Sequence, residues 1–173
     1  MATLVVHNPY GSSKLQAVVD DALHADLDAF VWRARRNRNG LMYPARWDKR
    51  SRRWLYLHIE VWKLMFQSAP LMFQSAPAGY QIDHKDNDTF NVQYQNLRLA
   101  TPSQNGANRR RASTHTNQYR GVSVVKKTGR FQARIRVQRK QIILGTFATP
   151  DEAARAYDAA ALHHFGQFAR PNF

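Results

Sequence analysis

The chain has 173 residues, which is enough for one domain of ordinary size or for two small ones, and two small ones fit better. Its 43% hydrophobic and 12% aromatic content supports packed cores and excludes general disorder, and the absence of cysteine excludes disulfide scaffolds and thiolate zinc sites. With 26 Lys and Arg against 12 Asp and Glu, the net charge is +14, which favours a polyanionic partner.

The amino-terminal third is predicted to contain strands at 3–7 and 15–19, a helix at 22–31, and a hairpin of strands at 41–47 and 53–58. Aromatic residues in this hairpin either pair across the strands or stack on bases: Tyr43, Trp47, Trp54 and Tyr56. A basic cluster in the same third predicts a surface that faces phosphates: Arg33, Arg35, Arg36, Arg38, Lys49, Arg50, Arg52 and Arg53.

A heptad is duplicated at 64–70 and 71–77, where LMFQSAP occurs twice in succession. Seven residues are about two helical turns, but Pro70 argues against one continuous helix. The second copy could loop out, or it could lengthen the connection enough for domain exchange between two chains. The sequence alone leaves this choice open.

Residues 79–111 hold a grouping whose residue types and spacing together indicate chemistry. Residues 81–84, which end in Asp83 and His84, predict a short strand that enters a polar loop, and 96–99 predict a returning strand. A capping box at 101–104 predicts a helix from Pro102 that carries Asn105. Asn96 follows His84 by 12 residues, and Asn105 lies nine residues further on.

This strand, loop, strand and helix segment resembles the HNH (ββα-metal) nuclease family, in the variant where an asparagine, here Asn105, replaces the final histidine. The resemblance implies that His84 is the general base and that Asn96 keeps it in place. It also implies that Asp83 and Asn105 hold one Mg²⁺ or Mn²⁺ ion, to which their oxygen donors are suited. An imidazole with an ordinary pKa of roughly 6.5 is largely neutral at pH 7 and can accept a proton from water. Activated water would attack phosphorus and leave 5′-phosphate and 3′-hydroxyl ends, as in this family.

His58 stands where relatives of this kind carry a histidine followed by arginine, whereas Ile59 follows it here. A second site residue is one interpretation of His58. Packing or a phosphate contact is the alternative.

Residues 89–150 contain 12 Lys or Arg and no acidic residue. Apolar residues are interleaved with this charge, so we expect a folded unit with a basic surface rather than a disordered tail. Strands are predicted at 119–126, 131–138 and 141–147, and a capping box at 149–152 predicts a helix that Gly166 ends. In the middle strand, apolar and basic or polar residues alternate, which gives one core face and one basic face.

The motifs YRGV at 119–122, LGTF at 144–147 and EAARAYDAAALHHFGQFARPNF at 152–173 closely resemble APETALA2/ethylene-response-factor DNA-binding domains. The resemblance implies a sheet that lies in the major groove. Ser123, Val125 and Ile143 stand where plant members commonly carry Arg or Trp, so base readout of the plant type is not implied. Arg134 or Arg136 could still contact guanine. The expected DNA-binding residues, most of them phosphate contacts, are Arg109, Arg110, Arg111, Arg120, Lys126, Lys127, Arg134, Arg136, Arg139 and Lys140.

The expected fold class is therefore α+β: a ββα-metal (HNH) nuclease domain followed by a small three-stranded antiparallel sheet packed on one helix. Residues 1–111 would form an N-terminal hairpin region and the nuclease unit, with its core at 58–111. Residues 112–116 would be a linker and 117–173 the APETALA2-like domain.

The two resemblances together imply a metal-dependent DNA endonuclease of phage or homing type, acting on double-stranded DNA. A single centre per chain favours nicking, and monomer or homodimer is left open. The alternative is a non-catalytic, sequence-specific DNA-binding regulator with a decayed nuclease fold, and a third option is a structure-selective or RNA-directed nuclease. No apolar run approaches the roughly 18 residues of a spanning helix, and MATLVVHNPY lacks the features of a secretion signal. We therefore expect a cytoplasmic, nucleoid-associated protein of a bacterial host cell.

Overall fold

The computed structural model describes residues 1–38, 40–66, 75–109 and 118–173. Its contacts divide the chain into two compact units, Met1–Leu99 and Ala100–Phe173. Together the described residues form four α-helices and three β-sheets, which confirms the mixed α+β class. None of the helices in the described ranges has both the length and the apolar character required to cross a bilayer. The central part of the heptad duplication, the linker predicted at 112–116, Arg110 and Arg111 lie outside the described residues.

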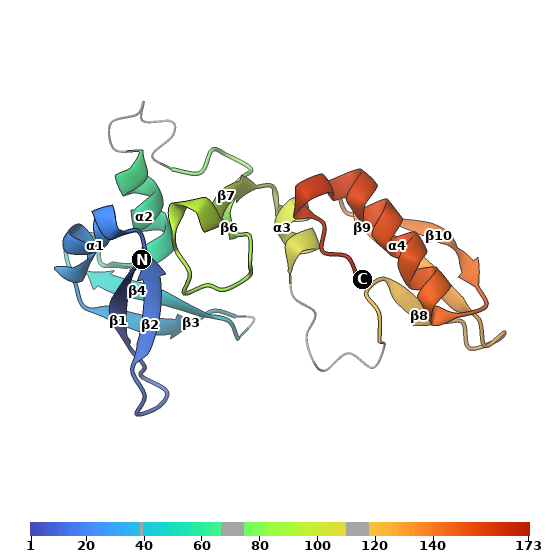
Figure 1. The fold of residues 1–173 in the computed structure, drawn as a ribbon, viewed down its shortest axis with the longest axis horizontal. Helices are drawn as coiled ribbons and strands as arrows, with labels where there is room; N and C mark the ends of the chain where they lie inside the picture. Colours follow the sequence, from blue (N-terminus) through green and yellow to red (C-terminus); the bar gives the residue numbers. More distant parts are fainter. Residues whose placement is uncertain (39, 67–74, 110–117) are drawn as a thin grey trace. The chain divides into compact units, whose positions relative to one another are not determined.

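The first unit is built on a five-stranded sheet with the order β2-β1-β3-β4-β5. Its strands are antiparallel except for β1 and β3, which run parallel. The strands are β1 (Ala2–His7), β2 (Leu15–Val19), β3 (Trp32–Arg36), β4 (Met42–Asp48) and β5 (Arg53–Tyr56). Helices α1 (Asp21–Asp28) and α2 (Leu57–Met65) lie on the same side of this sheet (Figure 1).

The core of the first unit lies between the sheet and these two helices. Strand β1 alternates, with Leu4 and Val6 buried and Val5 and His7 exposed, so only one face of the sheet packs inward. The buried cluster joins both helices to three strands and to the segment that follows them: Leu4, Val6, Ala17, Val19, Leu23, Leu27, Trp32, Ala34, Leu57, Val61, Trp62, Val92 and Leu97.

Three features of this unit differ from the sequence-based expectation. Strand β3 was not predicted, and it runs through part of the basic cluster. Helix α1 ends at Asp28, before Phe30 and Val31, and the strand expected at 53–58 ends at Tyr56. His58 therefore lies in the first turn of α2.

The second unit packs helices against a three-stranded antiparallel sheet with the order β10-β9-β8. Helix α4 covers one face of that sheet (Figure 1). The elements are α3 (Pro102–Asn108), β8 (Val122–Val124), β9 (Phe131–Val137), β10 (Lys140–Phe147), α4 (Pro150–Phe165) and the 3₁₀ helix η3 (Gly166–Phe168). Both predicted capping boxes are present, at Thr101 and Thr149, and Gly166 caps the end of α4. Helix α3 joins the same core through Ala107.

Gly121, in the YRGV motif, allows helix α4 to approach the sheet closely. Its φ of +73° is a conformation that side chains disfavour, and a Cβ there would lie 2.0 Å from Cδ2 of Tyr157. The Tyr157 ring therefore packs directly on the glycine backbone, which explains why the motif requires glycine at this position.

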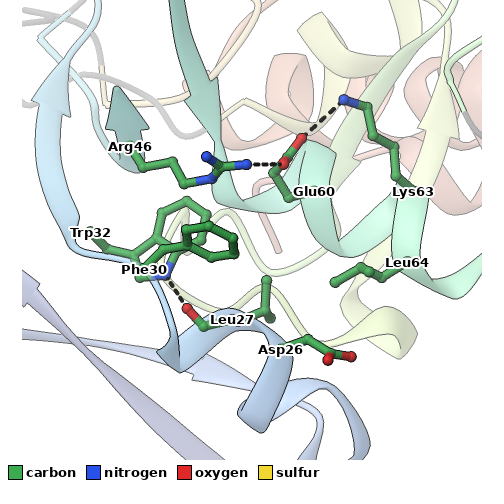
Figure 2. Close-up of a pocket in the computed structure, with 8 residues that line it drawn as sticks. All are labelled: Asp26, Leu27, Phe30, Trp32, Arg46, Glu60, Lys63 and Leu64. Atoms are coloured by element: carbon green, nitrogen blue, oxygen red, sulfur yellow. Dashed lines mark hydrogen bonds and ion pairs between the residues drawn. The ribbon is translucent and has the colours of Figure 1, made fainter. Parts of the chain in front are cut away.

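A pocket of about 500 Å³ lies between the core face of the first sheet and α2 (Figure 2). Within it, the Arg46 guanidinium pairs with Glu60 at 3.0 Å and lies 4.1 Å from the centre of the Phe30 ring. Lys63 also pairs with Glu60, at 2.9 Å. These contacts fasten β4 to α2. None of the predicted site residues lines this pocket.

Candidate active site

Asp83 and His84 are the last two residues of β6 (Gln81–His84), which forms a two-stranded sheet with β7 (Leu97–Ala100). Both residues are buried, at 5% and 6% exposure. The Arg98 side chain on β7 donates from Nε to Oδ2 of Asp83 at 2.9 Å, and it too is largely buried. The strand pair thus holds the Asp83 carboxylate in place.

The polar loop predicted after His84 is folded by its own Asx side chains. Asp86 accepts hydrogen bonds from the Asp88 backbone at 2.8 Å and from the side chains of Asn91 at 2.8 Å and Asn96 at 2.9 Å. Burial acts to raise the pKa of Asp86, but these hydrogen bonds outweigh it, and the pKa of this carboxyl is lowered. Asp86 is therefore held as the anion that organises the loop.

Asn96 spans the loop from the far side. It is 7% exposed and is the last residue of the short 3₁₀ helix η2 (Tyr94–Asn96). Its side chain accepts from the Asp86 backbone at 3.1 Å and donates to the Asn91 carbonyl at 2.7 Å, while its own carbonyl accepts from Lys85 N at 2.9 Å. The backbone that leaves His84 is thus bonded at several points to one asparagine.

The same loop is bonded to the main sheet of the first unit. Val18 on β2 donates to the Phe90 carbonyl at 2.8 Å and accepts from Val92 at 2.9 Å. The Thr89 hydroxyl donates to the Met42 carbonyl on β4. The loop after β6 is therefore hydrogen-bonded to two strands of the main sheet, β2 and β4.

His84 lies in a cluster of rings that comes from three elements. The ring of His58 is 5.2 Å from that of His84, centre to centre, with an angle of 71° between their planes. Tyr43 on β4 is 5.6 Å from His58 and 6.3 Å from His84. Tyr56, at the end of β5, is 5.9 Å from His58. The start of β4 and the end of β5 therefore lie beside the end of β6, where His84 is located.

Burial controls the charge of both histidines. Desolvation lowers the pKa of His84, although the carboxylates of Asp86, Asp83 and Asp88 act in the opposite direction. Desolvation, followed by the influence of His84, lowers the pKa of His58 to about 3. Nδ1 of His58 is buried and has no hydrogen-bond partner within the described part of the chain. Both rings are consequently neutral at pH 7.

The remaining predicted site residues belong to the second unit. Asn105 lies on α3, in the turn after the capping box. Arg134 and Arg136 are exposed on the sheet face that α4 does not cover. Arg136 donates from Nε to the Arg139 carbonyl at 3.2 Å. Four further predicted contacts, in the turns and at the start of β10, are also exposed: Lys126, Lys127, Arg139 and Lys140. Arg109 is exposed at the end of α3.

Arg120 differs from the other cations because its guanidinium is bound to the backbone at the end of α3. It donates to the Ala107 carbonyl at 2.8 Å and also to the Arg109 carbonyl, so it bonds the end of α3. Its backbone N–H donates to the Asn172 side chain at 2.7 Å. A DNA contact by Arg120 would have to compete with these bonds.

Sequence reasoning did not assign Arg98, Tyr43 or Tyr56 to the site. Arg98 had a local signal, because it follows Asn96 by two residues on the returning strand. The tyrosines had none, since only the folded sheet brings them to His84. Among the described residues, no group of three or more His, Cys, Asp or Glu side chains is arranged to hold a metal.

Comparison with known proteins supports both sequence resemblances. Residues 75–107 match the family model described as HNH endonuclease. APETALA2-like protein 2 of Oryza sativa is 45% identical over 65 residues, which are 38% of this chain and 15% of that protein. The chain thus combines a segment that matches the HNH endonuclease model with a segment similar to APETALA2-type proteins.

Two further similar proteins also come from a plant. The AP2-like ethylene-responsive transcription factor TOE2 of Arabidopsis thaliana is 45% identical over 65 residues, covering 38% of this chain and 13% of the relative. AIL7, of the same description and organism, is 54% identical over 57 residues, covering 32% of this chain and 11% of the relative. The chain thus spans less than a sixth of the length of these curated relatives.

Proposed function

We propose that this chain is a metal-dependent DNA endonuclease that hydrolyses phosphodiester bonds. The observation that carries the proposal is the buried Asp83-His84 pair at the end of β6, inside the segment that matches the HNH endonuclease model. The APETALA2-type segment and the net charge of +14 support DNA as the substrate. The combination favours an enzyme of phage or homing type that nicks duplex DNA.

His84 is the proposed general base. A neutral imidazole is needed to take a proton from the attacking water, and burial keeps His84 neutral by lowering its pKa. Attack on phosphorus would then release a 3′-hydroxyl and leave a 5′-phosphate. Asn96 is the proposed positioning residue, because its hydrogen bonds hold the backbone that leaves His84.

Asp83 and Asn105 are the proposed ligands of one Mg²⁺ or Mn²⁺ ion. The donor set fits such an ion, since a carboxylate and an amide oxygen are hard ligands and the chain contains no thiolate. The ion pair with Arg98 keeps the Asp83 carboxylate ordered in its buried position. A bound divalent cation would offset negative charge at the phosphorane and at the leaving 3′ oxygen.

The exposed cations of the second unit are proposed to hold the duplex. Arg109, Arg134, Arg136, Lys126, Lys127, Arg139 and Lys140 would contact it mainly through phosphates, together with Arg110 and Arg111. Such contacts set register and affinity rather than sequence preference. Arg120 is assigned to this set only if DNA displaces its bonds to α3.

Cleavage of supercoiled plasmid in Mg²⁺, Mn²⁺ or EDTA tests the enzyme proposal. Nicking is expected with either metal and not with EDTA, and His84→Ala should abolish it while DNA affinity measured in EDTA stays nearly unchanged. His7→Ala is the matched control, because His7 is an exposed histidine of the same unit on β1.

The plasmid experiment also separates the enzyme from its non-catalytic alternative. Tight DNA binding without metal-dependent cleavage would identify a DNA-binding regulator with a decayed nuclease fold. Nicking that persists in the His84→Ala protein would remove His84 from the role of base.

A further inference from the structure

The outer face of the first sheet carries arginine and aromatic side chains in register. Residues paired across neighbouring strands point to the same face. Arg33 pairs with Ala45, which pairs with Tyr56. The next pairs along the strands are Arg35 with Tyr43 and Trp47 with Trp54.

This face is opposite the core. Trp32 and Ala34, which alternate with Arg33 and Arg35 along β3, are buried in the core cluster. The Arg35 guanidinium lies 4.7 Å from the centre of the Trp54 ring, and Trp54 contacts Trp47 edge to face at 5.6 Å. Trp47 remains 48% exposed. The arginines and tryptophans thus form a cationic, aromatic layer over the sheet.

The layer leads directly to His84. Tyr43 and Tyr56, which belong to it by register, are the same two rings that contact the histidine pair. At the other end, the turn between β4 and β5 and the first residue of β5 add four exposed cations: Lys49, Arg50, Arg52 and Arg53. Among the described residues, none of the ion pairs involves Arg33 or Arg35. Their charge is therefore available to an anionic partner.

We propose that this surface, the arginine–tryptophan face (Arg33, Arg35, Trp47, Trp54 and the 48–53 turn), binds duplex DNA beside the phosphate cleaved at His84. The inference rests on the proposed function for the position of that phosphate. The partner is the substrate backbone, because guanidinium groups bind phosphates and the tryptophans shield the contact from water. The first unit would then bind DNA itself, in addition to the APETALA2-type unit.

The length of the face sets the size of this contact. Tyr43 and Trp47 are four steps apart along β4, which is about 13 Å at 3.3 Å per residue. Duplex DNA advances about 3.4 Å per base pair, so the face covers about four base pairs. We expect these pairs on one side of the scissile phosphate only, because the histidines lie at one end of the face.

Salt-dependent binding of the full chain tests the cationic contact. With a labelled 30-base-pair duplex in EDTA, Arg33→Gln and Arg35→Gln should each reduce the slope of log affinity against log salt by about 0.9. Lys63→Gln is the matched control, since it removes one charge from α2, on the other side of the sheet. Equal slopes for the wild type, both arginine variants and the control would overturn the proposal.

Site-directed crosslinking tests the place of contact. The chain has no cysteine, so Lys49→Cys and Lys63→Cys each accept a single photo-crosslinker. Crosslinking to DNA is expected from position 49 and not from position 63, and comparable yields from both would overturn the proposal. Neither measurement requires cleavage, so both still test DNA binding by the arginine–tryptophan face if the chain never nicks DNA. If the wild type nicks DNA and the arginine variants bind DNA as tightly as the wild type does, the proposed DNA contact of this face is rejected while the proposed nuclease function stands.

Discussion

The rings of His58 and His84 lie edge to face, with centres 5.2 Å apart and an angle of 71° between their planes. His58 is in the first turn of α2 and His84 ends β6, so two separate elements meet at this contact. Because the contact restricts where the His84 ring can turn, we assign His58 a positioning role rather than a place on the substrate.

Substitution of His58 should therefore affect turnover more than binding. His58→Ala is expected to lower kcat by about 100-fold with little change in KM, the order of loss that follows from a displaced catalytic group. His58→Phe should recover much of that loss, since it restores a ring against His84. Plasmid nicking at several DNA concentrations measures both constants. An equally inactive His58→Phe would show that a ring nitrogen, and not packing, is what the site requires.

The low pKa of His58 makes stability depend on pH. The pKa is about 3 in the folded chain against 6.5 when unfolded, so between these values the unfolded state binds more protons. Stability should be fully present above pH 6.5 and should fall as pH drops toward 3, by up to about 1.4 kcal/mol per pH unit for one proton. His84 adds a slope of the same sign, because its pKa is lowered too.

Urea unfolding in EDTA between pH 7 and pH 4 measures this dependence. The His58→Phe protein should show a shallower loss of stability than the wild type, because position 58 no longer takes up a proton on unfolding. Parallel curves for the two proteins would mean that His58 titrates normally in the folded chain.

Removing one partner of the ion pair between Asp83 and Arg98 should lower the free energy of unfolding strongly. Its side chains are only 6% and 12% exposed, so Arg98→Gln leaves a buried carboxylate without its cation, which typically costs 3–5 kcal/mol. The double variant Asp83→Asn with Arg98→Gln should be more stable than Arg98→Gln alone. Lys63→Gln, which breaks a more exposed pair, should cost about 0–1 kcal/mol. Similar losses for Arg98→Gln and Lys63→Gln in urea unfolding would contradict this.

Local signals predicted the elements that carry the candidate site. The capping boxes at Thr101 and Thr149 begin α3 and α4 as expected, and the Asx-rich loop after His84 folds on Asp86. These features depend on neighbouring residues, so the sequence displays them directly. Strand β3 was missed because its alternation offers only Trp32 and Ala34 among three arginines, and its burial depends on the packing of distant helices.

The pairing of His58 with His84 could not be predicted in this way. Their contact requires β4, β5 and α2 to meet the end of β6, and no local pattern encodes that meeting. The arginines of the first unit show the same limit. The sequence shows their positive charge. Which sheet face each arginine occupies follows only from the strand register, which places Arg33 and Arg35 on the outer face, whereas the Arg36 guanidinium lies over the Tyr10 ring.

The second unit should contribute its own share of the salt dependence through the exposed face of β9. Arg134→Ala with Arg136→Ala is expected to lower the slope of log affinity against log salt by about 1.8, because each lost phosphate contact is worth about 0.9. Point variants are preferable to removing residues 118–173, since Ala100 and Ala107 share their core with Tyr157 and Phe165. Arg155→Ala on α4 is the control, because Arg155 packs over the Phe173 ring, 4.9 Å from its centre. A double variant whose slope matches that of Arg155→Ala would remove the β9 face from the DNA interface.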